Sequence, residues 1–493
     1  MRKLSFALVG IGLALIAFFA GADLIGLGKD GGIGASQLLG IQAGIVVTLV
    51  GIGLLITNRD KNASPEEQFQ LSKIWDQPIL YWVLFTFLIA YISFFLLPVF
   101  FSKLQIQYLA KYIPDAFVTH IGFDIEAIVS RIENWLQTGQ SPYSDGFIAY
   151  PPLAIAVFAT FSIIGYPAYF KLIVSITVLA YLMAALIVPL LLIPKRSQIL
   201  LVLFFITGLF SYGLQFEQER GQFNLITFTI CLIAIYIFHF HHRYRFFAYL
   251  LFSLSIQLKI YPVFFIFMFV NDWKEWKSII KRFLGLGLFN FSLLFILGRN
   301  IFSDFLYVIM AYQFEYQSTR VENLSIKGFM HYLSTDSVQS SLPLSSQSIR
   351  SIEMFFMILL VVCLIFVIGR AIKYKETGLN PYLLLISTIA ALIIPSVSND
   401  YKLSILIAPM TLVLCGLPEI MDPKKKPYSL LLVILASLAY WTTMYPATVK
   451  PEYLGRNFPA LVIILISITI LNFLAPYTYE GTIQKSNNLA EYN

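Results

Sequence analysis

Two ionisable side chains stand at positions where an apolar chain rarely places charge. Asp124 heads the stretch 124–139, whose apolar residues recur with helical spacing opposite a polar face. Lys259, close to Pro262, interrupts the long apolar stretch 246–271. A carboxylate can accept a proton, and a lysine at membrane depth is a functional hypothesis by default because an uncompensated cation there is costly. The alternatives are that Asp124 only caps its helix and that Lys259 reaches back to the membrane surface.

A second polar group directly precedes an apolar span. Glu217 or Glu219 could orient a bound molecule or hold a metal ion, but both could equally pair with Arg220 in a hydrated turn. Gln222 and Asn224 come next, where an apolar helix is expected to begin. Their amides could read hydroxyl groups or could cap that helix.

The composition places these residues in a membrane protein. Hydrophobic residues make up 58% of the 493 residues, and charged residues make up 12%, about half the ~25% usual in soluble domains. This balance excludes a soluble enzyme, a disordered chain and a secreted disulfide scaffold. The net charge of +7 is spread over short loops, so no nucleic-acid partner is expected. The three cysteines lie inside apolar stretches and indicate neither disulfides nor a metal site.

Apolar runs of about 20 residues predict an all-α polytopic membrane protein with about 12 to 14 transmembrane helices. Two segments decide its topology, because 151–165 is short and 246–271 is interrupted. If 151–165 lies on the membrane surface and 246–271 forms two short helices, four basic residues face the cytoplasm and one faces outward. If both segments span, these sides are reversed. The positive-inside rule favours the first arrangement. The basic residues are Lys195, Arg196, Arg243 and Arg245 on the cytoplasmic side and Arg220 outside.

The favoured topology describes a multi-pass plasma-membrane protein with a cytoplasmic N-terminus and long polar loops on the outer face. The loop 102–168 would carry the amphipathic helix of Asp124. Asn323 and His331 would lie in another long outer loop, and Asp400 in a short one. Because the polar chain extends outward, we expect function on the outer face.

Glycines concentrate at the N-terminus, where the first 57 residues hold 12 of the 28 in the chain. Gly40 and Gly44 have a spacing that lets helices approach closely. We therefore favour an uncleaved helical hairpin over a cleaved signal peptide. Three regions follow: an N-terminal hairpin with its linker at 1–78, a core at 79–300, and an outer loop with a C-terminal helical part at 301–493.

Four short motifs follow one another on the predicted outer side. They are Asp124 with Gly139-x-x-Pro142-Tyr143 and Tyr150-Pro151-Pro152, then Gly221-Gln222-Phe223-Asn224, then Gln257-Leu258-Lys259-Ile260-Tyr261-Pro262, and last Asn323-Leu324-Ser325-Ile326-Lys327-Gly328. In order and spacing, the set resembles the GT-C superfamily of membrane glycosyltransferases. It is most similar to glycosyltransferase family 87, the relatives of polyprenyl-phosphate-mannose-dependent alpha-1,2-mannosyltransferases. The resemblance covers about residues 79–420.

The resemblance implies a GT-C-type fold with amphipathic surface helices in the first outer loop. It implies an inverting transfer of a sugar from a polyprenyl-phosphate-sugar donor to a lipid-linked or glycan acceptor of the cell envelope. Mannose is the expected sugar, because it is the best-known sugar of the family. Asp124 would take the proton of the acceptor hydroxyl, and Lys259 and Arg220 would stabilise the leaving phosphate. The residues expected to bind the sugar or the acceptor are Tyr143, Tyr150, Glu217, Glu219, Gln222, Asn224, Asn323, His331 and Asp400.

These roles require no cofactor. A divalent metal stays an open alternative, although the first outer loop lacks a D-x-D pair. We assign no metal ligands. The expected partners are the donor, the acceptor and membrane lipids. An alternative function is a transporter or flippase for lipid or polysaccharide. It would place acids and amides near the membrane midplane, whereas here the spans are nearly free of charge and the polar groups gather on one side. We therefore favour a transferase.

Overall fold

The computed structural model describes residues 7, 10–15, 18, 78–101, 121–193, 198–314, 323–335, 338, 340, 342–374, 376, 378–416, 426–444 and 457–474. Every regular element in this part of the chain is a helix, and one isolated β-bridge pairs Asn323 with Asn399. The prediction of an all-α membrane protein is confirmed. Most of the predicted N-terminal hairpin lies outside the described residues.

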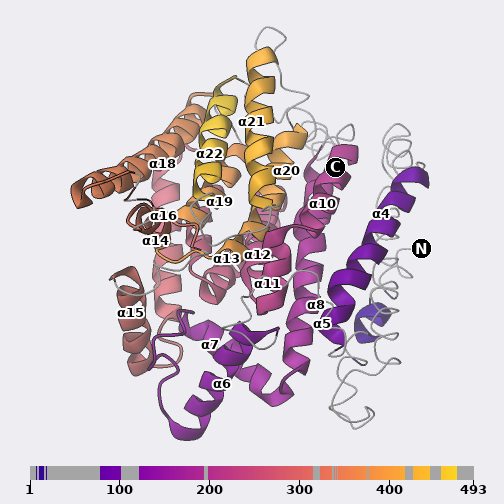
Figure 1. The fold of residues 1–493 in the computed structure, drawn as a ribbon, viewed down its shortest axis with the longest axis vertical. Coiled ribbons are helices and arrows are strands. Elements are labelled where there is room, and N and C mark those ends of the chain that lie inside the picture. Colours follow the sequence, from indigo (N-terminus) through magenta and orange to yellow (C-terminus); the bar gives the residue numbers. More distant parts are fainter. Residues whose placement is uncertain are drawn as a thin grey trace. The chain divides into compact units, whose positions relative to one another are not determined.

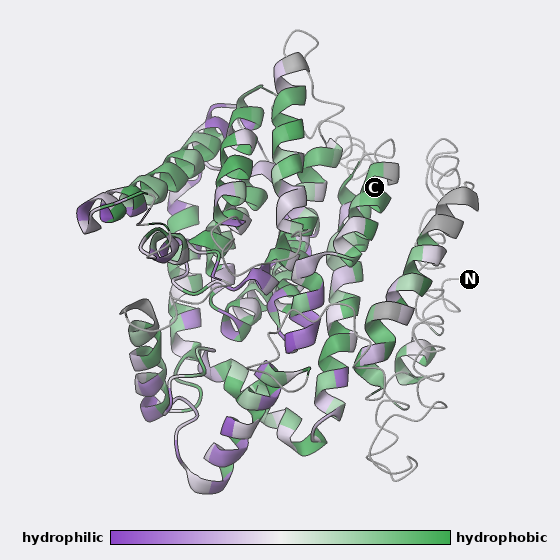
Figure 2. Ribbon diagram, in the orientation of Figure 1, coloured by the Kyte–Doolittle hydropathy of each residue, from purple (hydrophilic) through white to green (hydrophobic). Residues whose placement is uncertain are grey.

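Three helices in the described part are long and apolar enough to cross a membrane, or four if one bent pair forms a span. The three are Ala168–Leu192, Ser346–Tyr374 and Asn457–Leu474, and the bent pair is Leu200–Leu209 with Tyr212–Arg220, bent by 42°. The longest is α18 (Ser346–Tyr374), which is hydrophobic over its middle turns in Figure 2. The total of about 12 to 14 spans stays a prediction.

Contacts divide the chain into two compact units. The first consists of residues 1–126 and 160–176, and the second of residues 127–159 and 177–493. Asp124 belongs to the first unit, whereas all the other predicted site residues belong to the second. The predicted division into three regions stays a prediction.

Two prolines explain two irregular helical turns. Pro98 and Pro189 have no N–H to donate, and each proline ring crowds the carbonyl four residues earlier. A single π-turn, with its wider hydrogen-bonding step, relieves that crowding without ending the helix. The joined elements are α4 (Pro78–Tyr91), η1 (Ile92–Leu96) and α5 (Leu97–Phe100), and likewise α8 (Ala168–Leu182), η3 (Met183–Ile187) and α9 (Val188–Leu192).

The amphipathic helix predicted at 124–139 is present as α6 (Phe123–Thr138). Gly139, with φ of +77°, ends it as expected. Leu136, predicted on the apolar stripe, is instead 56% exposed. The residues of the stripe that are buried are Ile125, Ile128, Val129 and Ile132.

The start of α6 is fixed by a close packing contact within the first unit. Gly122 has φ of +85°, and a Cβ atom there would lie 2.8 Å from the ring of Phe170. The hydroxyl of Tyr166 donates to the carbonyl of Ile121 at 3.1 Å. A residue with a side chain at 122 would move the helix start, and with it Asp124.

The second unit is a helical core in which α12 packs on α13 and α21 packs on α22 (Figure 1). In the same core, α11 packs on η7 and α19 packs on η6. Its central helix α19 has every residue buried. Helix α7 (Pro152–Ile164) is divided between the two units after residue 159. The other elements of the second unit are α10 (Gln198–Leu209), α11 (Tyr212–Arg220), α12 (Asn224–Phe240), η5 (His242–Tyr244), α13 (Arg245–Leu258), η6 (Tyr261–Phe269), α14 (Trp276–Leu293), α15 (Arg299–Phe314), α16 (Ile326–Leu333), α18, α19 (Pro381–Ile393), η7 (Asp400–Leu406), α20 (Ile407–Gly416), α21 (Lys426–Met444) and α22 (Asn457–Leu474).

Candidate active site

The chain breaks its helix at Lys259, as the sequence predicts. Helix α13 ends at Leu258, and Lys259 has an extended backbone with φ of −152° and ψ of 142°. Pro262 lies in the first turn of the following 3-10 helix η6, and a continuous α-helix would force its ring against the carbonyl of residue 258. The extended backbone at the break directs the lysine side chain away from the axis of α13 and into the interior of the second unit.

The ammonium group of Lys259 is held by two amides. Lys259 is 9% exposed, and its Nζ donates to Oε1 of Gln222 at 2.9 Å and to Oδ1 of Asn224 at 2.8 Å. The Tyr150 hydroxyl donates to the same Gln222 oxygen at 2.9 Å. The ring centroids of Tyr150 and Tyr401 lie 5.1 Å and 5.6 Å from Nζ, within cation–π range. These five residues are called the Lys259 cluster below.

The turn between α11 and α12 presents the two amides. Gly221 has φ of +67°, the left-handed conformation that ends a helix, and its N–H donates to the carbonyl of Gln218 at 3.1 Å. The N–H of Gln222 donates to the carbonyl of Glu217 at 2.9 Å. On the far side of the turn, the Tyr261 hydroxyl donates to the Asn224 carbonyl at 2.6 Å. The amides are therefore fixed by the backbone on both sides.

Glu217 caps the helix that follows its own. The N-terminus of α12 has no cap from its own preceding residue, and the Leu225 N–H donates instead to Oε1 of Glu217 at 2.7 Å. The hydroxyl of Ser404 donates to Oε2 of the same carboxylate. Glu217 is fully buried, and its carboxyl group lies near both the N-terminus of α12 and Lys259. Both carboxylate oxygens thus accept protein donors that join α11, α12 and η7.

A second polar group surrounds Asp400 in the second unit. The side-chain amide of Asn457, the first residue of α22, donates to Oδ1 of Asp400 at 3.0 Å. The Tyr212 hydroxyl donates to Oδ2 at 3.4 Å. Next along the chain, the Asn399 amide donates to the Tyr401 hydroxyl at 2.9 Å. Tyr401 therefore links this group to the Lys259 cluster.

Asn323 joins two loops through its whole amide. Its Nδ2 donates to the Ser396 carbonyl at 2.8 Å, and its Oδ1 accepts from the N–H groups of Ser325 and Ser398 at 3.1 Å and 2.9 Å. Ser325 then caps α16 by accepting from Gly328 N–H at 3.0 Å. A Cβ at Gly328 would collide with the Asn323 carbonyl. These contacts make the N-x-S-x-x-G stretch a clamp on loop 396–399, and sugar binding by Asn323 stays a prediction.

Tyr143 and Tyr150 both lie in the loop that joins α6 to α7, and Tyr143 supports the backbone at Tyr150. Its hydroxyl donates to the Tyr150 carbonyl at 2.7 Å, and its ring packs 5.7 Å from that of Phe305. Burial, together with the nearby Asp304 carboxylate, raises the pKa of Tyr143 well above its ordinary value. The hydroxyl therefore stays protonated, as its role of donor requires.

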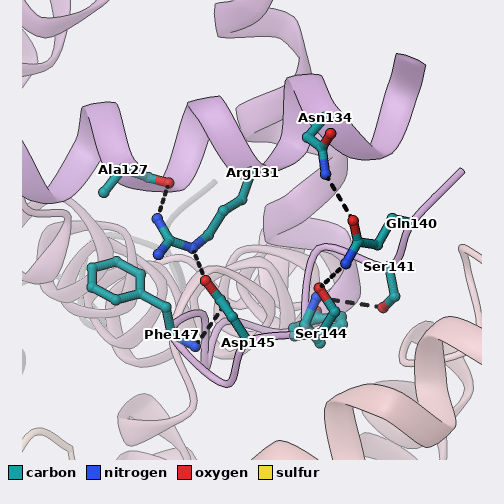
Figure 3. Close-up of polar contacts among 9 residues, drawn as sticks. Ala127, Arg131, Asn134, Gln140, Ser141, Ser144, Asp145 and Phe147 are labelled. Atoms are coloured by element: carbon teal, nitrogen blue, oxygen red, sulfur yellow. Dashed lines mark hydrogen bonds and ion pairs between the residues drawn. The ribbon is translucent and has the colours of Figure 1, made fainter. Parts of the chain in front are cut away.

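Figure 3 shows how the same loop is tied back to α6. The Arg131 side chain donates to Oδ2 of Asp145 at 2.6 Å and lies 4.1 Å from the ring centroid of Phe147. Arg131 also donates to the Ala127 carbonyl at 2.8 Å. This exposed ion pair fixes the path of the chain toward Tyr150 rather than forming a site itself.

Four other predicted site residues are not members of the Lys259 cluster or of the groups around Asp400 and Asn323. Glu219 is buried and Arg220 is half-buried in the last turn of α11, where the guanidinium lies 5.2 Å from the ring centroid of Phe216. His331 is half-buried on α16, and no hydrogen bond or ion pair in the described part joins it to the Lys259 cluster. Asp124 is the second residue of α6, half-buried, within the first unit. Their roles stay predictions.

From the sequence, Asn399 and Tyr401 stood out only as part of the run Asn399-Asp400-Tyr401-Lys402, which could close the site from the C-terminal half, and Ser404 and Asn457 did not stand out. Ser404 closely follows that polar run, which was a usable signal. Asn457 had none, because it begins an apolar helix that carries no motif. Among the described residues, no three His, Cys, Asp or Glu side chains gather as a metal-binding group.

Comparison with known families gives one finding. A model of glycosyltransferase family 87 matches residues 147–398, just over half of the chain, and this stretch contains Tyr150, Glu217, Gln222, Asn224 and Lys259. Comparisons with curated proteins and with solved structures give no match. The chain belongs to glycosyltransferase family 87.

Proposed function

We propose that this glycosyltransferase transfers a sugar from a polyprenyl-phosphate-sugar donor to a lipid-linked or glycan acceptor on the outer face of the plasma membrane. Mannose is the sugar that we propose. The observation that carries the proposal is the Lys259 cluster. A buried ammonium group fixed by two amide oxygens and flanked by two tyrosine rings is a preformed site for an anion. A phosphate monoester that gains charge as it leaves would be stabilised there.

The reaction balances with the residues of this chain. The acceptor hydroxyl oxygen attacks the anomeric carbon and forms the new glycosidic bond. The bond between that carbon and the phosphate oxygen breaks, and the polyprenyl phosphate leaves with the electron pair. Asp124 takes the hydroxyl proton as general base, and Lys259 compensates the phosphate charge. Attack opposite the leaving group inverts the anomeric centre.

The membrane setting supports a lipid-linked donor. The described part contains apolar helices long enough to span, and the predicted outer side carries the long polar loops. A donor whose sugar phosphate lies at the membrane surface while its chain stays in lipid fits a cation buried at a helix break. The positive-inside bias of the loops supports the outer face as the side of transfer.

A transfer assay tests the proposal. The purified full chain is mixed with polyprenyl-phosphate-mannose labelled in the sugar and with a lipid extract of the host. Wild type is expected to move the label to a new product, and Asp124→Asn to lose about 10²- to 10⁴-fold, the usual contribution of a general base. Glu126→Gln, in the same helical turn, is the matched control and should keep its rate.

Three outcomes would count against parts of the proposal. Full transfer by Asp124→Asn would remove that residue as the base. Transfer from a nucleotide sugar, but not from any polyprenyl-phosphate sugar, would reject the donor class. Movement of polyprenyl-phosphate sugar across a vesicle membrane without a new sugar product would favour the flippase alternative.

A further inference from the structure

The group around Asp400 includes two asparagine side-chain oxygen atoms that are buried and have no hydrogen-bond donor among the described residues. Asn457 is 4% exposed, and its Nδ2 donates to Oδ1 of Asp400 at 3.0 Å. Because the nitrogen must face the carboxylate, the amide oxygen of Asn457 faces elsewhere. That Oδ1 is buried and has no hydrogen-bond partner in the described part of the chain.

Asn399 repeats the arrangement beside it. It is 6% exposed, its Nδ2 donates to the Tyr401 hydroxyl at 2.9 Å, and its Oδ1 is buried with no partner among the described residues. Buried side-chain oxygens without a donor are uncommon in folded proteins, and each calls for a specific explanation. Here one such acceptor belongs to the residue that binds the Asp400 carboxylate, and the other belongs to the residue that precedes Asp400 in the chain.

The site adjoins the residues that would bind the donor phosphate. Tyr401 accepts from Asn399 through its hydroxyl, while its ring lies 5.6 Å from Nζ of Lys259. The donor sugar is attached to the phosphate through its anomeric carbon. If the phosphate binds at Lys259, the sugar therefore lies within about the width of one sugar ring from it. Sugar hydroxyl groups would supply the missing hydrogen-bond donors.

A cation is the competing ligand, since amide and carboxylate oxygens also suit hard cations. The geometry disfavours it, because the Asn457 oxygen points away from the carboxylate to which its own nitrogen is bonded. A metal ion could not take both as ligands without reversing that amide.

We infer that Asn457 and Asn399, beside Asp400, form a subsite that accepts hydrogen bonds from the hydroxyl groups of a sugar and helps to decide which sugar is used. This inference rests on the proposed function. Asn399, Asp400 and Asn457 all lie beyond the stretch that matches the family, residues 147–398. Asn457 contributes nothing to the Lys259 cluster, whereas Asn399 adjoins it through Tyr401.

Thermal unfolding of the full chain in detergent tests the subsite without requiring turnover. Polyprenyl phosphate and polyprenyl-phosphate-mannose are compared as ligands for wild type, Asn457→Ala and Asn399→Ala. If the donor sugar occupies the subsite, the sugar-bearing lipid stabilises wild type more than polyprenyl phosphate does, and both variants lose that difference. Asn472→Ala is the matched control, because its amide is likewise buried without a partner among the described residues but lies about four turns further along α22, away from Asp400.

The transfer assay then separates the two sources of the sugar. With methyl α-mannoside as the acceptor probe, an acceptor subsite predicts that Asn457→Ala raises the KM for this probe about tenfold with little change in kcat, as expected for the loss of a ground-state hydrogen bond. A donor subsite predicts the same rise for the donor and a changed preference between mannosyl and glucosyl donors. The use of two variants keeps the test valid if one of them fails to fold.

The outcomes are distinguishable. Unchanged sugar-dependent stabilisation and unchanged KM values in both variants would overturn the subsite while leaving the proposed function standing. A stabilisation by Mg²⁺ or Ca²⁺ that only these variants lose, without any sugar effect, would replace the sugar with a cation. If wild type binds neither polyprenyl lipid and transfers no sugar, the proposed function itself fails.

Discussion

The substitution Lys259→Met removes the ammonium group while keeping a long, apolar side chain. In the wild-type protein Nζ supplies a donor to Gln222 and another to Asn224. Gln222 Oε1 would keep the Tyr150 hydroxyl at 2.9 Å, but Asn224 Oδ1 would lose its donor inside the protein. One orphaned buried acceptor costs about 1–3 kcal/mol, so the variant should fold with reduced stability.

The expected effect on the reaction is larger and has a separate cause. Two unit charges about 4 Å apart at an effective dielectric constant of about 20 attract by roughly 4 kcal/mol. Since about 1.4 kcal/mol changes a rate tenfold, loss of the full attraction would cost about 10³-fold. The amides and the tyrosine hydroxyls remain as partial substitutes, so kcat/KM for the polyprenyl-phosphate sugar should fall about 10²- to 10³-fold.

A double variant separates the two effects. Lys259→Met with Asn224→Leu removes the orphaned oxygen together with the lysine and should recover most of the thermal stability lost by Lys259→Met, while transfer stays low. Lys277→Met, which removes an exposed lysine at the start of α14, is the control for loss of one positive charge and should behave as wild type.

The assay is the labelled-sugar transfer reaction, with thermal unfolding measured on the same preparations. If Lys259→Met folds and transfers within about threefold of wild type, Lys259 does not compensate the phosphate charge, and the reasoning from its buried cation is refuted. A double variant that regains transfer along with stability would show that the lysine acts only through folding.

Two further predictions concern stability. Gly213→Ala would place a Cβ 2.8 Å from the backbone nitrogen of Ser404. It should therefore push α11 away from η7 at a cost of about 1–3 kcal/mol and lower both Tm and the rate of transfer. Gly287→Ala is the control, because the glycine has open space around it and the substitution should not lower Tm. Burial raises the pKa of Glu376 although Arg370 Nε lies 3.8 Å away, so the folded state holds this proton more tightly than the unfolded state and the resulting stability is lost as pH rises through the folded pKa. Glu376→Gln should therefore gain Tm over wild type as pH rises from about 4 to about 8, and a difference that is constant with pH would contradict this.

The starts, ends and breaks of individual helices followed from local signals in the sequence. Helical periodicity and Gly139 predicted the helix 124–139, observed at Phe123–Thr138, and Pro262 predicted the end of α13 beside Lys259. The order of the motifs indicated the family that the match over 147–398 shows. Each of these signals acts within a few residues, through backbone geometry or the spacing of side chains along one helix.

Which side chains contact one another depends on how the helices pack. Gln222 and Asn224 serve the ammonium group of Lys259, although the sequence suggested equally that they cap a helix, and Glu217 does that capping from the preceding helix. Asn323, predicted to bind sugar, has its amide engaged with loop 396–399. Glu217 also shows the difference in scale, since one of its two sequence-based interpretations placed it in a hydrated turn, whereas it is fully buried.

Asn457 marks the limit of sequence reasoning most clearly. It lies 57 residues from the carboxylate that it binds, at the start of an apolar helix with no motif of its own. Periodicity shows which face of a helix is buried, but the partner of a buried polar atom is set by how distant helices pack. A side-chain amide can be satisfied by any donor or acceptor brought within about 3 Å, and only the packed structure brings one there.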